Sequence, residues 1–205
     1  MKKDEKTDAL KKIRDEVWAL ECPLSLERRQ NGVNAVLGEG SHDANVMFIG
    51  EAPGKNEAEQ GRPFCGAAGR VLDELLASIN MPRESVYITN IVKDRPTQNR
   101  DPSPEEIDLY APFLDRQIEI IQPKIIATLG RFSMQYLMNR YGLSHALDSI
   151  SKIHGQVFSA DTSYGKVTFV PLYHPAVALY NGATRDELKE DFKVIKKYLE
   201  QTKDL

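Results

Sequence analysis

Four short apolar runs alternate with longer segments whose apolar residues recur at helical spacing. The runs cover residues 46–49, 86–92, 124–129 and 167–173. A short apolar run bounded by turn residues is typical of a strand buried on both faces. Strands of this kind form parallel sheets that helices cover on both sides. The alternation therefore predicts an α/β fold, a three-layer α/β/α sandwich around a central four-stranded parallel sheet.

Periodicity and end signals mark the first helices. Apolar residues at helical spacing predict helices over residues 8–20 and 68–79. The sequence Ser-Pro-Glu-Glu at 103–106 predicts a helix start, because the serine caps, proline suits the first position and the second glutamate completes a capping box. We expect this helix to run to about residue 121, before Pro123.

The last third of the chain is less regular. We expect a helix after Gly130, and Thr184 with Glu187 forms a capping box that predicts the start of the last helix. Residues 141–166 carry no clear pattern. No repeat or low-complexity linker divides the chain, so we expect residues 1–205 to form a single domain.

Three polar residues stand where predicted strands end. Glu51 follows the first strand, Asn90 lies at the end of the second and His174 follows the fourth. Ligands of open parallel sheets bind beyond the carboxyl ends of the strands. A carboxylate, an amide and an imidazole from three strands therefore predict one site.

Composition narrows the class of protein. The formal net charge of −3 excludes a globally basic nucleic-acid binder, although basic residues gather just after the second strand. No apolar run approaches the roughly 20 residues that cross a bilayer, and the charged N-terminus lacks a signal pattern, so we expect a cytoplasmic protein. Two cysteines far apart, Cys22 and Cys65, give no self-contained metal site and predict no disulfide.

An aromatic residue in a glycine-rich loop is a further candidate. Phe64 lies in a loop close to Gly66 and Gly69. Such a residue either plugs the core or offers its ring to a flat ligand, and stacking a base on a ring is worth about 1–3 kcal/mol. The sequence leaves both readings open.

Five motifs in order carry a resemblance. They are Gly-Glu-Ala-Pro-Gly at 50–54, Gly-Arg-Pro-Phe-Cys-Gly-Ala-Ala-Gly at 61–69, Tyr-Ile-Thr-Asn-Ile-Val-Lys at 87–93, Asn-Arg-Asp-Pro-Ser-Pro-Glu-Glu at 99–106 and His-Pro-Ala at 174–176. From about residue 22 to residue 179 the chain resembles the family 4 uracil-DNA glycosylases. The resemblance implies the uracil-DNA glycosylase fold. It also implies hydrolysis of the N-glycosidic bond of uracil in single- or double-stranded DNA, leaving an abasic site. The sequence suggests no oligomer, so we expect a monomer.

The resemblance assigns roles around the base. Phe64 is expected to stack on the extruded uracil, and Asn90 to accept from N3–H and donate to O4. Cytosine presents the reverse pattern, and each mismatched buried polar group costs about 1–3 kcal/mol. His174 is expected to stabilise charge on O2 as the bond breaks. The purely structural alternatives are that Asn90 caps the end of a strand and that His174 forms part of a turn.

Water activation and pocket shape follow from the first motif. Glu51 is expected to position the water, with Asn99 as a weaker second candidate. Ala52 stands where the best-known uracil-DNA glycosylases hold an aspartate, and alanine cannot take a proton, so we expect a dissociative path. Glu57 matches the position that crowds the uracil C5 and excludes thymine, or else is a solvated carboxylate. Gly50 completes the expected substrate-binding set.

A second group of residues is expected to bind DNA. The phosphate-binding candidates are Lys93, Arg95, Asn99 and Arg100, together with backbone amides around Gly54, Gly66 and Gly130. The loop after His174 matches the one that enters the minor groove, which assigns DNA contacts to Ala176, Val177 and Leu179. Of these, Val177 or Leu179 is the expected wedge.

The chain departs from the family at its iron-sulfur cluster. The four ligand positions read Ala19, Cys22, Asp94 and Tyr110, so one cysteine of four remains. A cluster needs about four thiolates, and we therefore expect no cluster and no other metal. Packing and polar contacts that involve Trp18 and Tyr110 are expected to hold this region together.

Two alternatives remain open at this stage. Ala52 leaves a roomy apolar motif, which allows a broader glycosylase that acts on xanthine or hypoxanthine. A non-catalytic DNA-binding relative is the other alternative, although Glu51, Phe64, Asn90 and His174 together argue against a decayed site. Covalent trapping of the sugar is not expected, because residues 94–100 contain no histidine.

Overall fold

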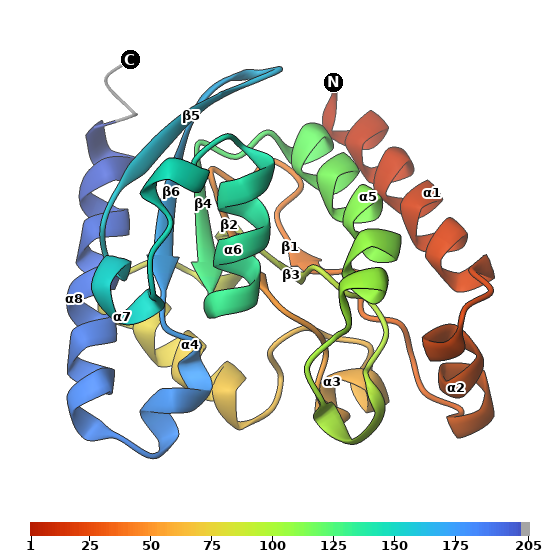
Figure 1. Ribbon diagram of the computed structural model, residues 1–205. Helices are drawn as coiled ribbons and strands as arrows, with labels where there is room; N and C mark the ends of the chain where they lie inside the picture. The colour runs from red at the N-terminus through yellow and green to blue at the C-terminus, as the bar shows by residue number, and fades with distance from the viewer. Residues whose placement is uncertain (202–205) are drawn as a thin grey trace.

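The computed structural model describes residues 1–201, which build one six-stranded sheet with helices on both faces (Figure 1). The strand order is β1-β3-β2-β4-β6-β5. Four strands run parallel, namely β3 (Tyr87–Asn90), β2 (Val46–Gly50), β4 (Ile125–Leu129) and β6 (Gly165–Leu172). The predicted α/β fold and its parallel core are confirmed.

The predicted strand count is wrong by two edge strands. A two-residue strand, β1 (Glu39–Gly40), pairs antiparallel with β3, and β5 (Phe158–Thr162) pairs antiparallel with β6. β5 is only partly buried and forms a hairpin with β6, so it lacks the continuous apolar run of the central strands. It lies in the segment 141–166 that the sequence left unassigned, together with η3 (Ser144–Ala146) and α7 (Ile150–Ile153).

Alternate residues of each strand face opposite helical layers. Met47 and Ile49 pack with α1 (Lys3–Ala19), α5 (Pro104–Ile121) and α6 (Arg131–Arg140), and Figure 1 shows α1 lying alongside α5. Val46 and Phe48 pack with α4 (Ala67–Ser78) and α8 (Gly182–Gln201). The remaining short helices are α2 (Pro23–Asn31), α3 (Lys55–Gln60), η1 (Arg83–Ser85), η2 (Thr97–Asn99) and η4 (Pro175–Leu179).

One predicted capping box is right and one is wrong. The Ser103 hydroxyl accepts from the Glu106 N–H at 3.3 Å, and the Glu106 carboxylate accepts from the Ser103 N–H at 2.8 Å. The last helix begins two residues before Thr184, because the Asn181 side chain accepts from the N–H groups of residues 183 and 184. Asparagine is as good an N-cap as threonine, and Asn181, which comes first in the chain, caps the helix.

The first helix also begins earlier than its apolar pattern. α1 starts at Lys3 rather than residue 8. Lys6 is buried in this added turn, and its ammonium pairs with Asp43 at 2.9 Å and donates to the Ile121 carbonyl at 3.3 Å. A polar side chain therefore anchors the turn that hydrophobic periodicity does not mark. No helix within residues 1–201 combines the length and the apolar character that crossing a bilayer requires.

Candidate active site

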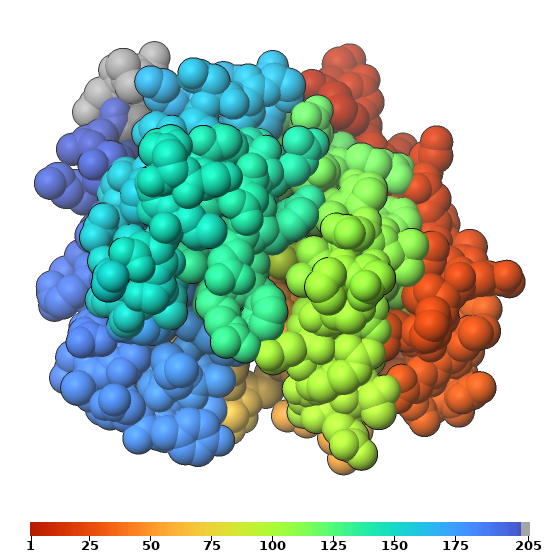
Figure 2. All heavy atoms as spheres, viewed as in Figure 1, coloured from red at the N-terminus to blue at the C-terminus, as the bar shows by residue number. Residues whose placement is uncertain are grey.

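A pocket of about 620 Å³ lies at the carboxyl ends of the parallel strands. In Figure 2 the surface is hollowed below the sheet, between the lime-green segment before α5 and the blue segment around η4. The pocket is lined by residues from five separate parts of the chain, among them Glu51, Ala52, Glu57, Phe64, Asn90, Asn99, Arg100, Asp101, His174 and Ala176. The convergence of strand ends that the sequence predicts is therefore present.

Phe64 and Gly50 shape the inner end of this pocket. The Phe64 ring centroid lies 5.6 Å from that of His174, and the two rings are tilted by 33°. Phe64 also packs into the core beneath α4, so it is both core residue and pocket wall. A Cβ atom on Gly50 would lie 2.4 Å from the Asn90 Oδ1 and 2.7 Å from the Phe64 ring. Glycine at this position therefore leaves room for the side chains of Asn90 and Phe64.

The backbone at Phe64 is held in an uncommon conformation. Its φ is 47°, in the left-handed region that non-glycine residues rarely adopt. Glu57 stabilises the loop, because its Oε1 accepts from the N–H groups of Cys65 at 3.1 Å and Gly66 at 2.9 Å. A Cβ on Gly69 would lie 1.8 Å from the Phe64 carbonyl oxygen, so only glycine fits at this position in the first turn of α4.

Asn90 presents an unused acceptor. The residue is 1% exposed, and its Oδ1 has no hydrogen-bond partner within residues 1–201. A buried polar atom without a partner costs about 1–3 kcal/mol. Since this oxygen belongs to a residue that lines the pocket, the arrangement favours a ligand that donates a hydrogen bond to it.

His174 is a neutral imidazole with a defined tautomer. Its Nδ1 accepts from the Ala176 N–H at 3.1 Å, which leaves the proton on Nε2. Burial lowers the pKa of His174 to about 4. The ring is therefore uncharged near neutral pH and has one N–H to offer as a donor.

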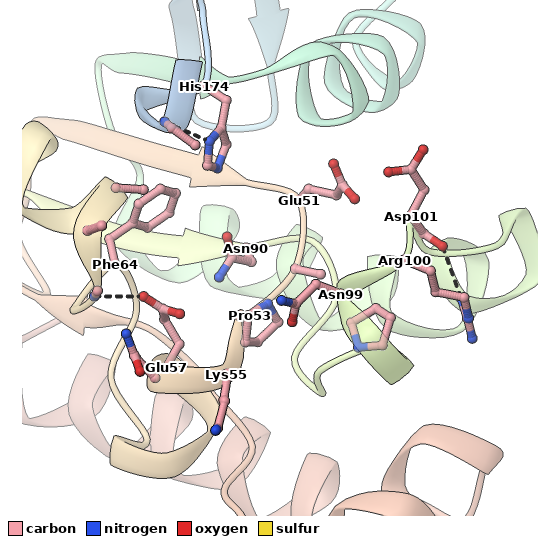
Figure 3. Close-up of a pocket in the computed structure, with 18 residues that line it drawn as sticks. Glu51, Pro53, Lys55, Glu57, Phe64, Asn90, Asn99, Arg100, Asp101 and His174 are labelled. Atoms are coloured by element: carbon pink, nitrogen blue, oxygen red, sulfur yellow. Dashed lines mark hydrogen bonds between the residues drawn. The ribbon is translucent and has the colours of Figure 1, made fainter. Parts of the chain in front are cut away.

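Glu51 faces a second carboxylate that sequence reasoning missed. Glu51 is half-buried directly after β2, and burial together with the charge of Asp101 raises its pKa to about 7. Figure 3 shows the side chains of Glu51 and Asp101 pointing toward each other across the pocket. Asp101 is held by Arg131, whose Nη2 donates to its Oδ2 at 2.8 Å. The sequence places Asp101 inside the Asn-Arg-Asp-Pro motif, but we interpreted that motif as a phosphate-binding segment.

Several predicted phosphate contacts are wrong. Lys93 is completely buried, so its ammonium cannot reach DNA. The amide of Gly66 donates to Glu57, and the amide of Gly130 donates to the Leu172 carbonyl at 2.9 Å. These groups lie within the fold because the strand ends and loops use them for their own hydrogen bonds.

Other predicted DNA contacts remain accessible. Arg100 is half-exposed at the pocket and is held by both carboxylate oxygens of Glu106 at 2.7 and 2.6 Å. Arg95 donates to the Asn99 Oδ1 at 2.7 Å, which weakens the case for Asn99 as a water ligand. On η4, Val177 and Leu179 are 41% and 43% exposed.

The exposed apolar surface of η4 extends one residue further. Tyr180 is 90% exposed at the end of η4 and was not singled out from the sequence. An apolar loop beside the pocket is consistent with the predicted wedge.

A polar network occupies the positions of the family's cluster ligands. The Arg28 Nη1 lies 2.9 and 3.1 Å from the two Asp94 oxygens, and the Tyr110 hydroxyl donates to Asp94 at 2.6 Å. The Cys22 sulfur lies 3.4 Å from the Tyr110 hydroxyl. The Arg28 guanidinium also covers the Trp18 ring at 4.9 Å, which confirms the expected involvement of Trp18 and Tyr110.

This donor set does not fit an iron-sulfur cluster. Asp94 is already paired with a buried cation, Tyr110 is a weak ligand and Ala19 offers no ligand atom. No group of three or more potential metal ligands occurs within residues 1–201. The remaining thiol, Cys22, instead accepts from the Ser25 N–H at the start of α2.

Comparison with known proteins agrees with this geometry. The family model of the uracil DNA glycosylase superfamily matches residues 37–200. The chain is 47% identical to the "Type-4 uracil-DNA glycosylase" of Sulfurisphaera tokodaii over 92% of this chain and 84% of that protein. It is 46% identical to the type-4 protein of Archaeoglobus fulgidus over 89% of each, and 39% identical to that of Thermotoga maritima over 88% of each. The chain belongs to the uracil DNA glycosylase superfamily and groups with its type-4 members.

Proposed function

We propose that this protein removes uracil from DNA by hydrolysing the bond between uracil N1 and the deoxyribose C1′. The observation that carries the proposal is the unpaired, buried Oδ1 of Asn90, in one pocket with Phe64 and a neutral His174. Family membership and the type-4 names of the relatives support it. The enzyme is then a monofunctional hydrolase of base excision repair.

Base selection follows from the pocket. The uracil leaves the base stack, which costs a few kcal/mol, and enters the pocket against the Phe64 ring. The Asn90 Oδ1 accepts from uracil N3–H, and its amide donates to O4. Cytosine has an acceptor at N3 and a donor at C4, so both hydrogen bonds would be lost. Glu57 fixes the Phe64 loop through two N–H groups, and we retain the proposal that its position beside the base excludes the thymine methyl group.

Bond cleavage places negative charge on the leaving base. As the C1′–N1 bond breaks, its electron pair stays with uracil and spreads to O2. The Nε2–H of His174 donates to O2 and stabilises that charge without transferring a proton. A neutral donor suits this role because it needs no counter-charge in a buried site.

The sugar cation is then captured by water. Ala52 offers no base, so Glu51 is the group that holds the water and takes its proton. Asp101, fixed by Arg131, faces the same space. Burial and the charge of Asp101 together raise the Glu51 pKa to about 7, which is suited to a base at neutral pH.

DNA binding and the absence of a cluster complete the proposal. Arg95 and Arg100 contact phosphates, while Val177 or Leu179 fills the gap that the extruded base leaves, with Ala176 beside it. The protein works without an iron-sulfur cluster, supported by the Arg28–Asp94–Tyr110 contacts. The single domain over residues 1–205, the monomer and the cytoplasmic location stay predictions. Its two unpaired cysteines agree with a reducing compartment.

The proposal is tested with an oligonucleotide that carries one uracil. Free uracil and alkali-labile strands are measured for the wild type, Asn90→Ala and His174→Ala, with Asn139→Ala on the exposed side of α6 as the matched control. We expect losses of at least about tenfold for Asn90→Ala and about a hundredfold or more for His174→Ala. An intact uracil strand with the wild type, or full rates in both variants, would contradict the proposal.

A further inference from the structure

Lys93 is a completely buried lysine at the back of the active site. It lies three residues beyond Asn90, and its relative exposure is 0%. No carboxylate pairs with it in the part of the chain that the structure describes, and burial alone lowers its pKa, to about 7. Lysine is almost never fully buried unless it is paired. A lysine without a paired anion at this depth therefore calls for a functional explanation.

The surroundings of Lys93 are built for an ammonium group. The Nζ donates to the Asn90 carbonyl at 2.6 Å, to the Gln117 Oε1 at 2.6 Å and to the Thr89 Oγ1 at 2.9 Å. An ammonium group has three N–H donors, whereas a neutral amine has two and needs a donor in return. Three neutral acceptors therefore match the charged form.

The acceptor roles are fixed by a second layer of contacts. The Gln117 Nε2 donates to the Leu37 carbonyl at 2.8 Å, which turns its Oε1 toward Lys93. The Thr89 hydroxyl donates to the same carbonyl at 2.7 Å, so its oxygen is free to accept. The Asn90 carbonyl can only accept. None of the three groups offers a proton to Lys93, and none neutralises its charge.

The charge lies one residue away from the leaving base. Lys93 contacts the backbone of Asn90, whose side chain lines the pocket. Fields of buried charges are screened much less than those at the surface. A positive charge behind Asn90 is therefore felt in the pocket where the glycosidic bond breaks.

We propose that Lys93 is a buried cation that holds Asn90 in place and stabilises the negative charge that develops on the departing base. The inference rests on the proposed function and deepens it. Lys93 does not touch the base, so it is a positioning and electrostatic residue that acts from behind Asn90. The anion of the leaving base supplies the counter-charge that no carboxylate in the described chain provides to Lys93.

The experiment compares two leaving groups. Single-turnover rates at saturating enzyme are measured on matched oligonucleotides with uracil or 5-fluorouracil. Fluorine withdraws electrons and makes the departing anion more stable, so 5-fluorouracil needs less help. The variant is Lys93→Met, and the control is Lys189→Met, which makes the same change at a half-exposed lysine on α8 that pairs with Asp186.

We expect Lys93→Met to lose about tenfold or more with uracil and about threefold or less with 5-fluorouracil, while Lys189→Met leaves both rates unchanged. Equal losses on both substrates would show that Lys93 only supports the fold. Unchanged rates would show that Lys93 does not contribute to bond cleavage. Either result overturns the inference. Inactive wild-type protein would instead overturn the proposed function.

A second variant covers the case in which Lys93→Met does not fold. Gln117→Glu keeps the lysine and an acceptor at the 2.6 Å contact but places a carboxylate there, and it gives up the hydrogen bond from the Gln117 Nε2 to the Leu37 carbonyl. We expect the same selective loss with uracil, because the pair is then neutral. A Gln117→Glu protein with the wild-type ratio of the two rates would overturn the inference.

Discussion

His174 and Glu51 are both partly buried, and burial moves their pKa values in opposite directions, because one is charged when protonated and the other when deprotonated. For His174 the result is a neutral donor, fixed as the Nε2–H tautomer by the Ala176 amide. For Glu51 the result is a carboxyl group that changes charge near neutral pH. The same physical effect therefore yields an uncharged donor after β6 and a base after β2, at the same edge of the sheet.

The Glu51 pKa predicts the acid side of the pH profile. Since the pKa is raised to about 7, Glu51 is protonated below that value and cannot take a proton from water. The single-turnover rate on uracil should rise with pH through about 7, whereas Glu51→Gln should be slow and lack this limb. Asp101→Asn should shift the limb to lower pH, because the Asp101 charge helps to raise the Glu51 pKa. An unchanged limb in Glu51→Gln would contradict the assigned role.

Some residues could not be placed from the sequence alone. Lys93 was expected at the DNA surface because lysine is usually exposed, and only the packing of α5 against β3 shows that it is buried. Asp101 became visible only when the loop before α5 was seen to face Glu51. The sequence did predict the pocket positions of Phe64, Asn90 and His174, because each belongs to a motif at a predicted strand end or glycine-rich turn.

At the scale of elements, the network around Asp94 joins α1, α2 and α5 to the segment that follows β3. Arg28 of α2 donates to Asp94 after β3 and to the carbonyls of Val17 and Trp18 in α1. Tyr110 adds α5. The segment that follows Asp94 carries Asn99, Arg100 and Asp101 to the pocket, so this network holds the base of an active-site loop.

The network predicts a strong effect of removing one charge. Arg28→Met leaves Asp94 buried without its cation, and removing one partner of a buried pair costs about 3–5 kcal/mol. The melting temperature should therefore fall by about 10 °C or more. Arg14→Met, at an exposed arginine of α1 paired with Asp15, is the control and should change it little.

Two further observations bear on the same network. The double variant Arg28→Met/Asp94→Leu should recover part of the lost stability, because neither charge then remains buried. A melting temperature that Arg28→Met leaves unchanged, or stoichiometric iron and sulfide in the purified protein, would contradict the account of this region.

Sequence patterns predicted the elements unevenly, and the reasons are physical. The four parallel strands were recognisable because both of their faces are buried, which requires continuous apolar runs. β5 is less buried than the central strands, and β1 has only two residues. Neither strand therefore appears in the sequence as a continuous apolar run. The helix start at Ser103 was predicted correctly because the following proline and glutamate support it. The start predicted at Thr184 was wrong because Asn181, earlier in the chain, is the N-cap.

At the scale of the whole molecule, the parallel sheet is what makes a site from distant residues. Parallel strands end at one edge, so the segments after β2, β3 and β6 meet although they are far apart in the chain (Figure 1). The two helical layers fill both faces of the sheet and leave this edge open. Fold and site therefore follow from the same arrangement.

The central claim is that Phe64, Asn90 and His174 surround one uracil. A crystal structure with uracil bound tests it most directly. We predict the base against the Phe64 ring, with about 2.7–3.2 Å from the Asn90 Oδ1 to N3 and from the His174 Nε2 to O2. Uracil bound in another cavity, or bound here with the Asn90 amide and the His174 ring turned away from its edge, would contradict the account.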